Sequence, residues 1–419
     1  MNVAVVNLFD PPPGEPVRQG RYLFLCRALV ERGHAVRWYS SAFSHALKLP
    51  RDPAAVAAAA EKEGYRVTLA SADPYATNVS LARLRSHART ARWLADRWAR
   101  ESGRPDAIVV SLPTPAVGRA AAEWADRTGA ALVVDVQDLW PETFGRFWPC
   151  GLGWMNSVLF ARMIRDVHAT YRHASSIVGV ARGYTDHGLA HARPGTPGAT
   201  LYLGVDVAAF DASVRSLAEV GLEKPPGERW LFLAGSLSAY VDVDAALDLM
   251  EELRTRGRTD VRLHVAGTGA MEPHMRSEAA RRRLANVTFH GRLPDAAFMS
   301  LEVATDLALL PLRLSAYVFF PNRVFDFFAA ALPVVSTVQG ELAEVLARHG
   351  AGVTCASTDG RVLADAVERL LADRPPDPRD YRDRRGPWIG RYDRREIGRA
   401  FARFIEDHGA TVRARGDQG

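Results

Sequence analysis

The segment from residue 306 to residue 337 constrains the fold of this chain more than any other stretch. Asp306–Leu310 is an apolar run that predicts a buried strand, and Val324–Ala331 has the spacing of a helix with one apolar face. Pro333 ends that helix, and Val334–Thr337 predicts the next buried strand. Strand, loop, helix and strand in this order predict a unit of an α/β sheet.

The loop before the predicted helix has the features of an anion-binding site. Unpaired N–H groups and the helix dipole attract negative charge at a helix N-terminus, and Pro321 suits the first turn of that helix. Arg323 adds a permanent positive charge, and Asp326 offers a carboxylate that can bind vicinal hydroxyls. The combination predicts a diphosphate next to a ribose. The alternative is a structural crossover in which both side chains are merely solvated.

The rest of the chain repeats the alternation of strands and helices. Val3–Leu8 and Ala35–Tyr39 predict strands on either side of an amphipathic helix, Arg21–Arg32. No G-x-G-x-x-G sequence follows the first strand, so a dinucleotide site is not predicted. Further strands are predicted at Ala107–Ser111, Ala131–Val136, Ser176–Val180, Thr200–Leu203, Trp230–Ala234, Val261–Ala266 and Asn286–His290.

The residues around Arg323 resemble a known family. The order P-x-R-x-x-D-F-x-A-x-x-x-P-V, which starts at Pro321, is similar to the donor-site signature of family 4 of the retaining glycosyltransferases. These enzymes have the GT-B fold, and the pattern most resembles the branch that works on polysaccharide and natural-product sugars. The resemblance implies that the backbone of Phe320, Pro321 and Asn322 holds the nucleotide diphosphate. It also implies that Arg323 faces the phosphates and that Asp326 binds the ribose.

A stretch near the N-terminus resembles the same family. The order G-R-Y-x-x-L-x-R-A-L-V-E-R-G-H-x-V begins at Gly20 and is similar to the family's N-terminal signature. The resemblance implies that Gly20 and Arg21 belong to a loop that reaches the donor phosphates across an interdomain cleft.

The sequence D-V-Q-D-L-W-P-E, residues 135–142, resembles the D-x-x-D-L-W-P-E motif of that branch. It implies that Asp138 stands near the place of a histidine that contacts the transferred sugar in relatives, and we expect Glu142 to contribute to acceptor binding. The structural alternative is that Asp138 and Glu142 cap a short helix over Leu139–Phe147.

Strands in the second half of the chain end in glycine turns that resemble the family's nucleotide domain. Relatives often carry an arginine and a lysine in the first of these turns, where this chain has Ser236 and then acidic residues. Arg323, the helix N-terminus and another cation such as Arg313 or Arg21 would then have to neutralise the diphosphate, because an unpaired anion in a cleft is costly. The donor-binding residues implied by these turns are Gly235, Ser236, Gly267, Gly291, Arg292 and Leu293, the last three around the base.

We therefore expect an α/β protein of the GT-B type, with two Rossmann-like domains facing across a cleft. Residues 1–210 are predicted to form an N-terminal acceptor-binding domain and residues 211–390 a C-terminal nucleotide-sugar-binding domain. Residues 391–419 are predicted to contain a helix that returns to the N-terminal domain, followed by a disordered tail.

Composition and cysteine spacing argue against several other classes of protein. Cys26, Cys150 and Cys355 lack metal-ligand spacing, no apolar run approaches the length of a transmembrane helix, and no signal peptide is evident, so we expect a cytoplasmic protein. A net charge of +5 favours anionic partners weakly, and a nucleotide-sugar satisfies this without nucleic acid. The basic helix predicted at residues 81–104 could contact a membrane surface, but we favour the interpretation that it is a solvent-exposed helix.

The predicted function is retaining transfer of a sugar from a nucleoside-diphosphate donor, of UDP or GDP type, to a small-molecule or saccharide acceptor. We expect it in natural-product or polysaccharide biosynthesis, with Arg323 and Asp138 as the catalytic residues. No cofactor besides the donor substrate is predicted, and no D-x-D metal motif is evident. One alternative is a non-catalytic scaffold or partner subunit, because the arginine–lysine pair and the histidine are missing. The other is a nucleotide-sugar epimerase.

Overall fold

The computed structural model describes residues 1–77, 80–101, 103–147, 154–316, 318–373 and 380–409. The chain forms two compact units. The N-terminal unit contains Met1–Leu203 and the residues from Arg394 onward, and the C-terminal unit contains Gly204–Asp393. The boundaries thus lie at 203/204 and 393/394, where the sequence analysis places them at 210/211 and 390/391.

In the described part of the N-terminal unit, seven strands form one sheet in which every pairing is parallel. The order is β3-β2-β1-β4-β5-β6-β7, so the direction of winding reverses beside β1. In such sheets the carboxyl ends of the strands at this reversal are where ligands bind. The strands are β1 Asn2–Val6, β2 Ala35–Ser41, β3 Arg66–Ala70, β4 Ala107–Leu112, β5 Ala131–Val136, β6 Ser176–Gly179 and β7 Gly198–Thr200.

Helices cover both faces of this sheet. Trp38 on β2 packs against Tyr22 of α1, whereas the next residue, Tyr39, contacts Trp98 of α3 and Trp124 of α4. Successive residues of a strand point to opposite faces, so α1 lies on one side and α3 and α4 lie on the other. The helices are α1 Arg21–Glu31, α2 Pro53–Lys62, α3 Leu81–Arg100, α4 Pro115–Thr128, α5 Met155–Leu159, α6 Ala161–His173, α7 Arg182–His191 and α16 Arg394–Gly409.

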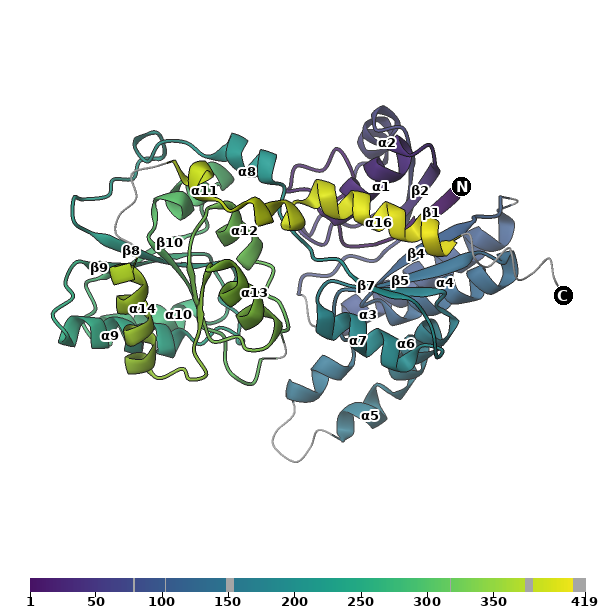
Figure 1. Cartoon of the computed structure of the whole chain (residues 1–419). Helices are drawn as coiled ribbons and strands as arrows, with labels where there is room; N and C mark the ends of the chain where they lie inside the picture. The colour runs from purple at the N-terminus through teal and green to yellow at the C-terminus, as the bar shows by residue number, and fades with distance from the viewer. Residues whose placement is uncertain (78–79, 102, 148–153, 317, 374–379, 410–419) are drawn as a thin grey trace. The chain divides into compact units, whose positions relative to one another are not determined.

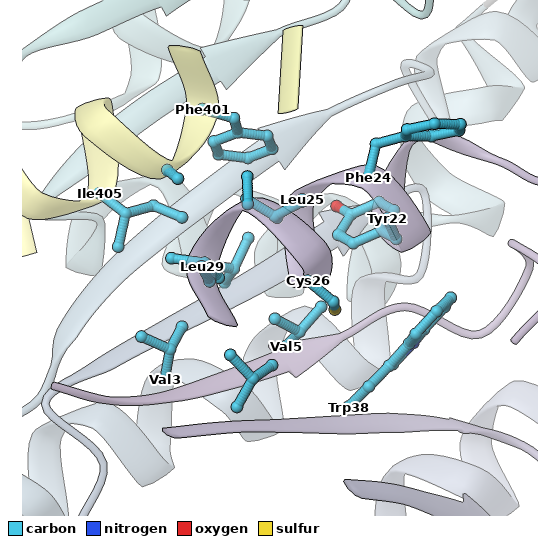
Figure 2. Packing of buried hydrophobic residues seen from close by; sticks show 14 of the residues in the cluster. Val3, Val5, Tyr22, Phe24, Leu25, Cys26, Leu29, Trp38, Phe401 and Ile405 are labelled. Carbon is cyan, nitrogen blue, oxygen red and sulfur yellow. The ribbon is translucent and has the colours of Figure 1, made fainter. Parts of the chain in front are cut away.

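The C-terminal helix α16 packs against α1 and completes the core of the N-terminal unit (Figure 1). Phe401 and Ile405 of α16 join buried residues of α1 and of the sheet in one hydrophobic cluster (Figure 2). At Gly398 a Cβ atom would lie 2.6 Å from the Phe24 carbonyl oxygen, so only glycine allows the two helices to approach this closely.

The described part of the C-terminal unit has a second parallel sheet of six strands, in the order β10-β9-β8-β11-β12-β13. Its strands are β8 Arg229–Ala234, β9 Val261–Ala266, β10 Val287–Gly291, β11 Leu307–Leu310, β12 Val334–Ser336 and β13 Gly352–Thr354. Its helices are α8 Val207–Ser213, α9 Val243–Thr255, α10 Glu272–Arg281, α11 Asp295–Ala304, α12 Val324–Ala329, α13 Glu341–His349, α14 Gly360–Asp373 and α15 Tyr381–Arg384. The predicted α/β class with two parallel-sheet domains is therefore confirmed.

Two segments differ from what their composition suggests. Residues 211–229 have mixed charge and contain Pro225-Pro226-Gly227, as linkers do, yet Asp211 lies in α8 and pairs with Arg385. The helical stretch before β6 is two helices, α5 and α6, separated at Phe160, and residues 151–153 lie outside the described residues.

Two further features concern membrane-spanning helices and cysteines. No helix in the described ranges is long and apolar enough to cross a membrane. Cys26 and Cys355 are buried free thiols, and Cys150 lies outside the described residues.

Candidate functional site

The glycine turns after β8, β9 and β10 lie together at the carboxyl edge of the C-terminal sheet. The Gly235 amide donates to the Ala266 carbonyl at 2.9 Å, and the Gly267 amide donates to the Gly291 carbonyl at 2.7 Å. Hydrogen bonds from one loop to the next therefore hold these turns in a fixed arrangement, as the order of the motifs in the sequence suggests.

Glycine is required at two of these positions. Gly235 and Gly267 have φ angles of +111° and +146°, which L side chains rarely adopt. A Cβ atom at Gly267 would lie 1.8 Å from the Gly235 carbonyl oxygen, which is too close for any residue with a side chain. Glycine at these positions therefore lets the two turns pack directly on each other, backbone against backbone.

Arg323 lies against the first of these turns. A Cβ atom on Gly235 would stand 3.4 Å from Nε of Arg323, and the guanidinium carbon is 4.9 Å from the ring centroid of Phe298. One guanidinium nitrogen donates to Asp326 Oδ2 at 2.5 Å. Gly235, Arg323 and Asp326 are thus brought together, with the cation held by a carboxylate one turn away.

The backbone before α12 differs from the predicted helix start. Pro321 lies in a turn before the helix, which begins at Val324, and the amides of Val324, Phe325 and Asp326 donate to carbonyls of residues 321–323. Those early amides are therefore already used. The amides of Asn322 and Arg323 have no hydrogen-bond partner in the described part of the chain.

The remaining predicted donor residues differ in how exposed their side chains are. Phe320 is buried, and its ring stacks on Phe325 at 5.2 Å, so it has a packing role. Ser236 and Arg292 are exposed, and Leu293 is partly buried. Arg313, a candidate replacement for the missing cations, is tied to the loop after β8, because its Nε donates to the Ala239 carbonyl at 3.1 Å.

Asp138 and Glu142 follow β5 in the N-terminal unit. Asp138 Oδ1 accepts from the Leu139 amide at 2.8 Å, and burial raises the pKa of this carboxyl above its ordinary value. Burial also raises the pKa of Glu142, which begins the 3-10 helix Glu142–Phe147 and has His187 Nε2 at 3.8 Å. The Glu142 carboxylate oxygens are buried without a hydrogen-bond partner among the described residues.

Gly20 and Arg21 make contacts inside the N-terminal unit. Arg21 is only 3% exposed, with one guanidinium nitrogen donating to the Leu201 carbonyl at 2.9 Å and the other 3.5 Å from Asp135 Oδ1. A Cβ atom at Gly20 would lie 2.2 Å from an Asp10 carboxylate oxygen. These contacts stabilise the start of α1, and the donor-binding role of both residues stays a prediction.

The structure also gathers side chains that the sequence analysis did not connect. Phe9, Lys48, Tyr75, Arg83, His87 and Trp140, which we call the Arg83 cluster, come from loops that follow β1, β2, β3 and β5 and from the first turns of α3. No local pattern could have revealed it, because its members are spread over more than a hundred residues. Its only signal in the sequence is the arginine content of α3.

Metal ligation has no candidate in the described ranges. Among those residues, no group of at least three His, Cys, Asp or Glu side chains is arranged to hold a metal ion.

Residues 228–373 match the model of the family described as "Glycosyl transferases group 1". This range contains the glycine turns, Arg323 and Asp326. Glycogen synthase of Mycobacterium tuberculosis is 27% identical over 227 residues, a match that covers 53% of this chain and 51% of that protein. The chain therefore spans about half the length of the curated relatives it matches.

Solved structures resemble the whole chain. Alr3699/HepE of Anabaena in complex with UDP has a TM-score of 0.59 and 15% identity, covering 100% of this chain and 99% of that one. Sucrose-phosphate synthase of Thermosynechococcus elongatus has a TM-score of 0.64 and 14% identity, covering 100% and 98%. The fold is GT-B.

Proposed function

We propose that this chain is a glycosyltransferase that moves a sugar from a nucleoside-diphosphate sugar to a small-molecule or saccharide acceptor. The observation that carries the proposal is the position of Arg323, held against the bare backbone of Gly235 within the range that matches the glycosyltransferase group 1 model. UDP is the first nucleotide to test, because HepE, which shares the fold, was solved in complex with UDP.

The chemistry asks the protein mainly to stabilise charge. As the sugar–phosphate bond breaks, negative charge grows on the departing diphosphate, and prearranged donors at that place lower the barrier. Arg323 and the amides of Asn322 and Arg323 supply such donors. Asp326 keeps the guanidinium in place and, in this proposal, also binds the ribose.

Asp138 acts, in this proposal, on the sugar or the acceptor when it is ionised, either orienting the acceptor or favouring positive charge on the sugar. Glu142 contributes to the same region. Retention of anomeric configuration and independence from metal belong to the proposal too, and they rest on the likeness of the Pro321–Val334 stretch to the retaining family's signature.

The test compares Arg323→Ala with Arg281→Ala, an exposed arginine at the end of α10. Removal of one charge-stabilising donor lowers turnover by about a hundredfold to a thousandfold, so we expect a loss of that size for Arg323→Ala and none for the control. Activity of Arg323→Ala within a few-fold of wild type would contradict the assigned leaving-group contact.

A thermal-shift panel of UDP, GDP, dTDP and ADP identifies the base, because a ligand that binds only the native state raises its melting temperature. Incubation of donor alone separates the remaining candidates. Isomerisation of the sugar without acceptor indicates an epimerase, and absence of any nucleotide binding favours a non-catalytic scaffold.

A further inference from the structure

Exposed apolar side chains gather toward one edge of the N-terminal unit. In the described ranges, eight large apolar side chains are more than a third exposed, and six of them belong to segments that follow β2, β3 and β5. Parallel strands all end at the carboxyl edge of their sheet, so these segments start from the same edge. Single exposed apolar residues need no explanation, whereas several near one edge indicate a contact surface. The six residues are Leu47, Leu49, Leu81, Trp154, Val158 and Leu159.

Helix α5 turns its apolar side chains away from the rest of the unit. Asn156 is buried, and its side-chain nitrogen donates to the Pro141 carbonyl at 3.0 Å. Trp154 and Val158 lie two positions before and after Asn156, so helical geometry places them on the opposite face. They are 64% and 65% exposed, and Leu159 beside them is 58% exposed. α5 lies beside α6 at the outside of the unit and contains no charged residue (Figure 1).

The start of α3 has a similar exposed apolar residue. Leu81 is the first residue of this helix and is 69% exposed. α4 packs against both α3 and α6, so the three helices form one layer. Each of them connects two parallel strands of the sheet and therefore begins at the carboxyl edge. Leu81 and α5, which leads into α6, are thus at the same end of this layer. We call Leu81, Trp154, Val158 and Leu159 the apolar tips.

Exposed arginines follow the apolar tips along both helices. Arg85 and Arg89 lie four and eight residues after the start of α3, and Arg162 and Arg165 lie in the first two turns of α6. At a rise of about 1.5 Å per residue, all four stand within about 12 Å of the helix starts. The order from the edge inward is therefore apolar first and positively charged next.

Acidic residues are scarce in these segments. Residues 81–92 contain none, and residues 161–166 contain only Asp166. Asp166 acts electrostatically on the arginines of α6, and Asp73 pairs with Arg89 at 2.5 Å, so part of the positive charge is offset. Arg85 has no such carboxylate within the described ranges.

This order of side chains suits the surface of a membrane. Apolar side chains of a peripheral protein enter the bilayer by about 5–10 Å, and tryptophan favours the membrane interface. Arginines a similar distance behind them meet the phosphates of anionic lipids. A membrane presents its apolar and charged layers at fixed depths, and α3 and the α5–α6 segment match that order separately.

We propose that this edge of the N-terminal unit binds the surface of membranes that contain anionic lipids. The apolar tips enter the interface, and the exposed arginines of α3 and α6 bind lipid phosphates. Such a contact needs no membrane-crossing helix, and none is found in the described ranges. The inference does not depend on the proposed function, because its side chains belong to the N-terminal unit and the candidate donor site to the C-terminal unit.

The experiment measures co-sedimentation of the full chain with two kinds of vesicle. One is phosphatidylcholine alone, and the other contains equal parts of phosphatidylcholine and phosphatidylglycerol. We expect the chain to bind the mixed vesicles about tenfold more tightly or better, because each arginine near an anionic surface adds to the affinity. Added salt should weaken this binding by screening the charges.

The variants are Trp154→Ser and the double variant Arg85→Gln with Arg162→Gln. Trp154→Ser is expected to weaken binding to the mixed vesicles about tenfold, because apolar area no longer enters the interface. The double variant is expected to weaken it about tenfold or more.

The matched controls are Val362→Ser, at an exposed apolar residue of α14, and Arg127→Gln, at an exposed arginine in the last turn of α4. Each control should change binding less than about twofold. All of these side chains are exposed, so the variants should melt at the wild-type temperature. No binding of the wild type to mixed vesicles, or unchanged binding of Trp154→Ser, overturns the proposal.

Light scattering of the free chain tests a different occupant of the apolar tips. A dimer that dissociates in Trp154→Ser, in a chain that binds no vesicles, assigns the tips to a contact between copies and overturns the membrane proposal. The UDP thermal shift of the same proteins separates this inference from the proposed function. A response to UDP without vesicle binding overturns this inference alone.

Discussion

Single residues decide the shape of the candidate donor site, and glycine does so most directly. Gly267 is fixed twice, by its φ angle of +146° and by the Gly235 carbonyl oxygen that occupies the place of a side chain. The hydrogen bonds between the turns are made beside this contact, so a side chain here would disturb the packing of the candidate donor site.

Gly267→Ala is expected to lower the free energy of unfolding by about 2–4 kcal/mol, because backbone must move to admit the methyl group. Gly227→Ala is the matched control, with a φ angle of +86° but nothing within 4 Å of the added Cβ atom. It is expected to cost about 1 kcal/mol from strain alone. Denaturant unfolding measures both, and equal losses would show that the contact with Gly235 is unimportant.

At this scale the sequence predicts neighbours better than distant partners. Arg323 and Asp326 are three positions apart on one turn, so their contact follows from local spacing. The ion pair of Arg21 with Asp135, 114 positions along the chain, could not be predicted from local spacing. Local sequence patterns do not reveal contacts between residues that are this far apart in the chain.

Elements whose apolar faces are strongly periodic were predicted from sequence, and weakly patterned ones were missed. Helix α1 has an apolar face, and the central strands β5 and β9 are long apolar runs. α2 is mostly alanine, with only Val56 and Ala60 buried, and the short strands β3 and β13 lie at sheet edges. Helix α12 stops at Ala329, with Ala331 at a φ angle of +53° turning the chain toward Pro333.

The packing of α16 on α1 gives a prediction about one element. Phe401 is 1% exposed within the shared core, whereas Phe404 is only partly buried against it. Phe401→Ala is expected to cost about 3–5 kcal/mol through the cavity it leaves, and Phe404→Ala about 1 kcal/mol. Hydrogen exchange of α1 amides under mild denaturant measures the difference, and equal effects would argue against a structural role for this face of α16.

For the whole molecule, buried histidines set the response to acid. Burial lowers the pKa of His87 to about 3 and those of His45, His187 and His264 to about 4. In the unfolded chain a histidine binds a proton below about pH 6.5. Between these values the unfolded state holds more protons, so stability falls as the pH falls.

We therefore expect the free energy of unfolding to decrease from pH 7 toward pH 5. His87 alone contributes up to about 1.4 kcal/mol per pH unit in this window. Urea unfolding of wild type and His87→Gln checks this, and the variant should show a shallower pH dependence below about pH 6.5. Between pH 7 and pH 8, where these histidines are neutral in both states, the two slopes should agree. Identical slopes at acid pH would refute the contribution of His87.

The return of α16 to the N-terminal unit has a consequence for biosynthesis. A ribosome makes residues 1–203 before residues 394–409, so the part of α1 that contacts α16, where Arg21 lies over Phe401 and Phe24 lies beside Gly398, stays uncovered until α16 has emerged. The later-made unit, which is continuous in the chain, can therefore mature before the earlier one. Until α16 has been synthesised, the N-terminal unit exposes apolar surface on α1. We therefore expect the nascent chain to bind chaperones that shield apolar surfaces.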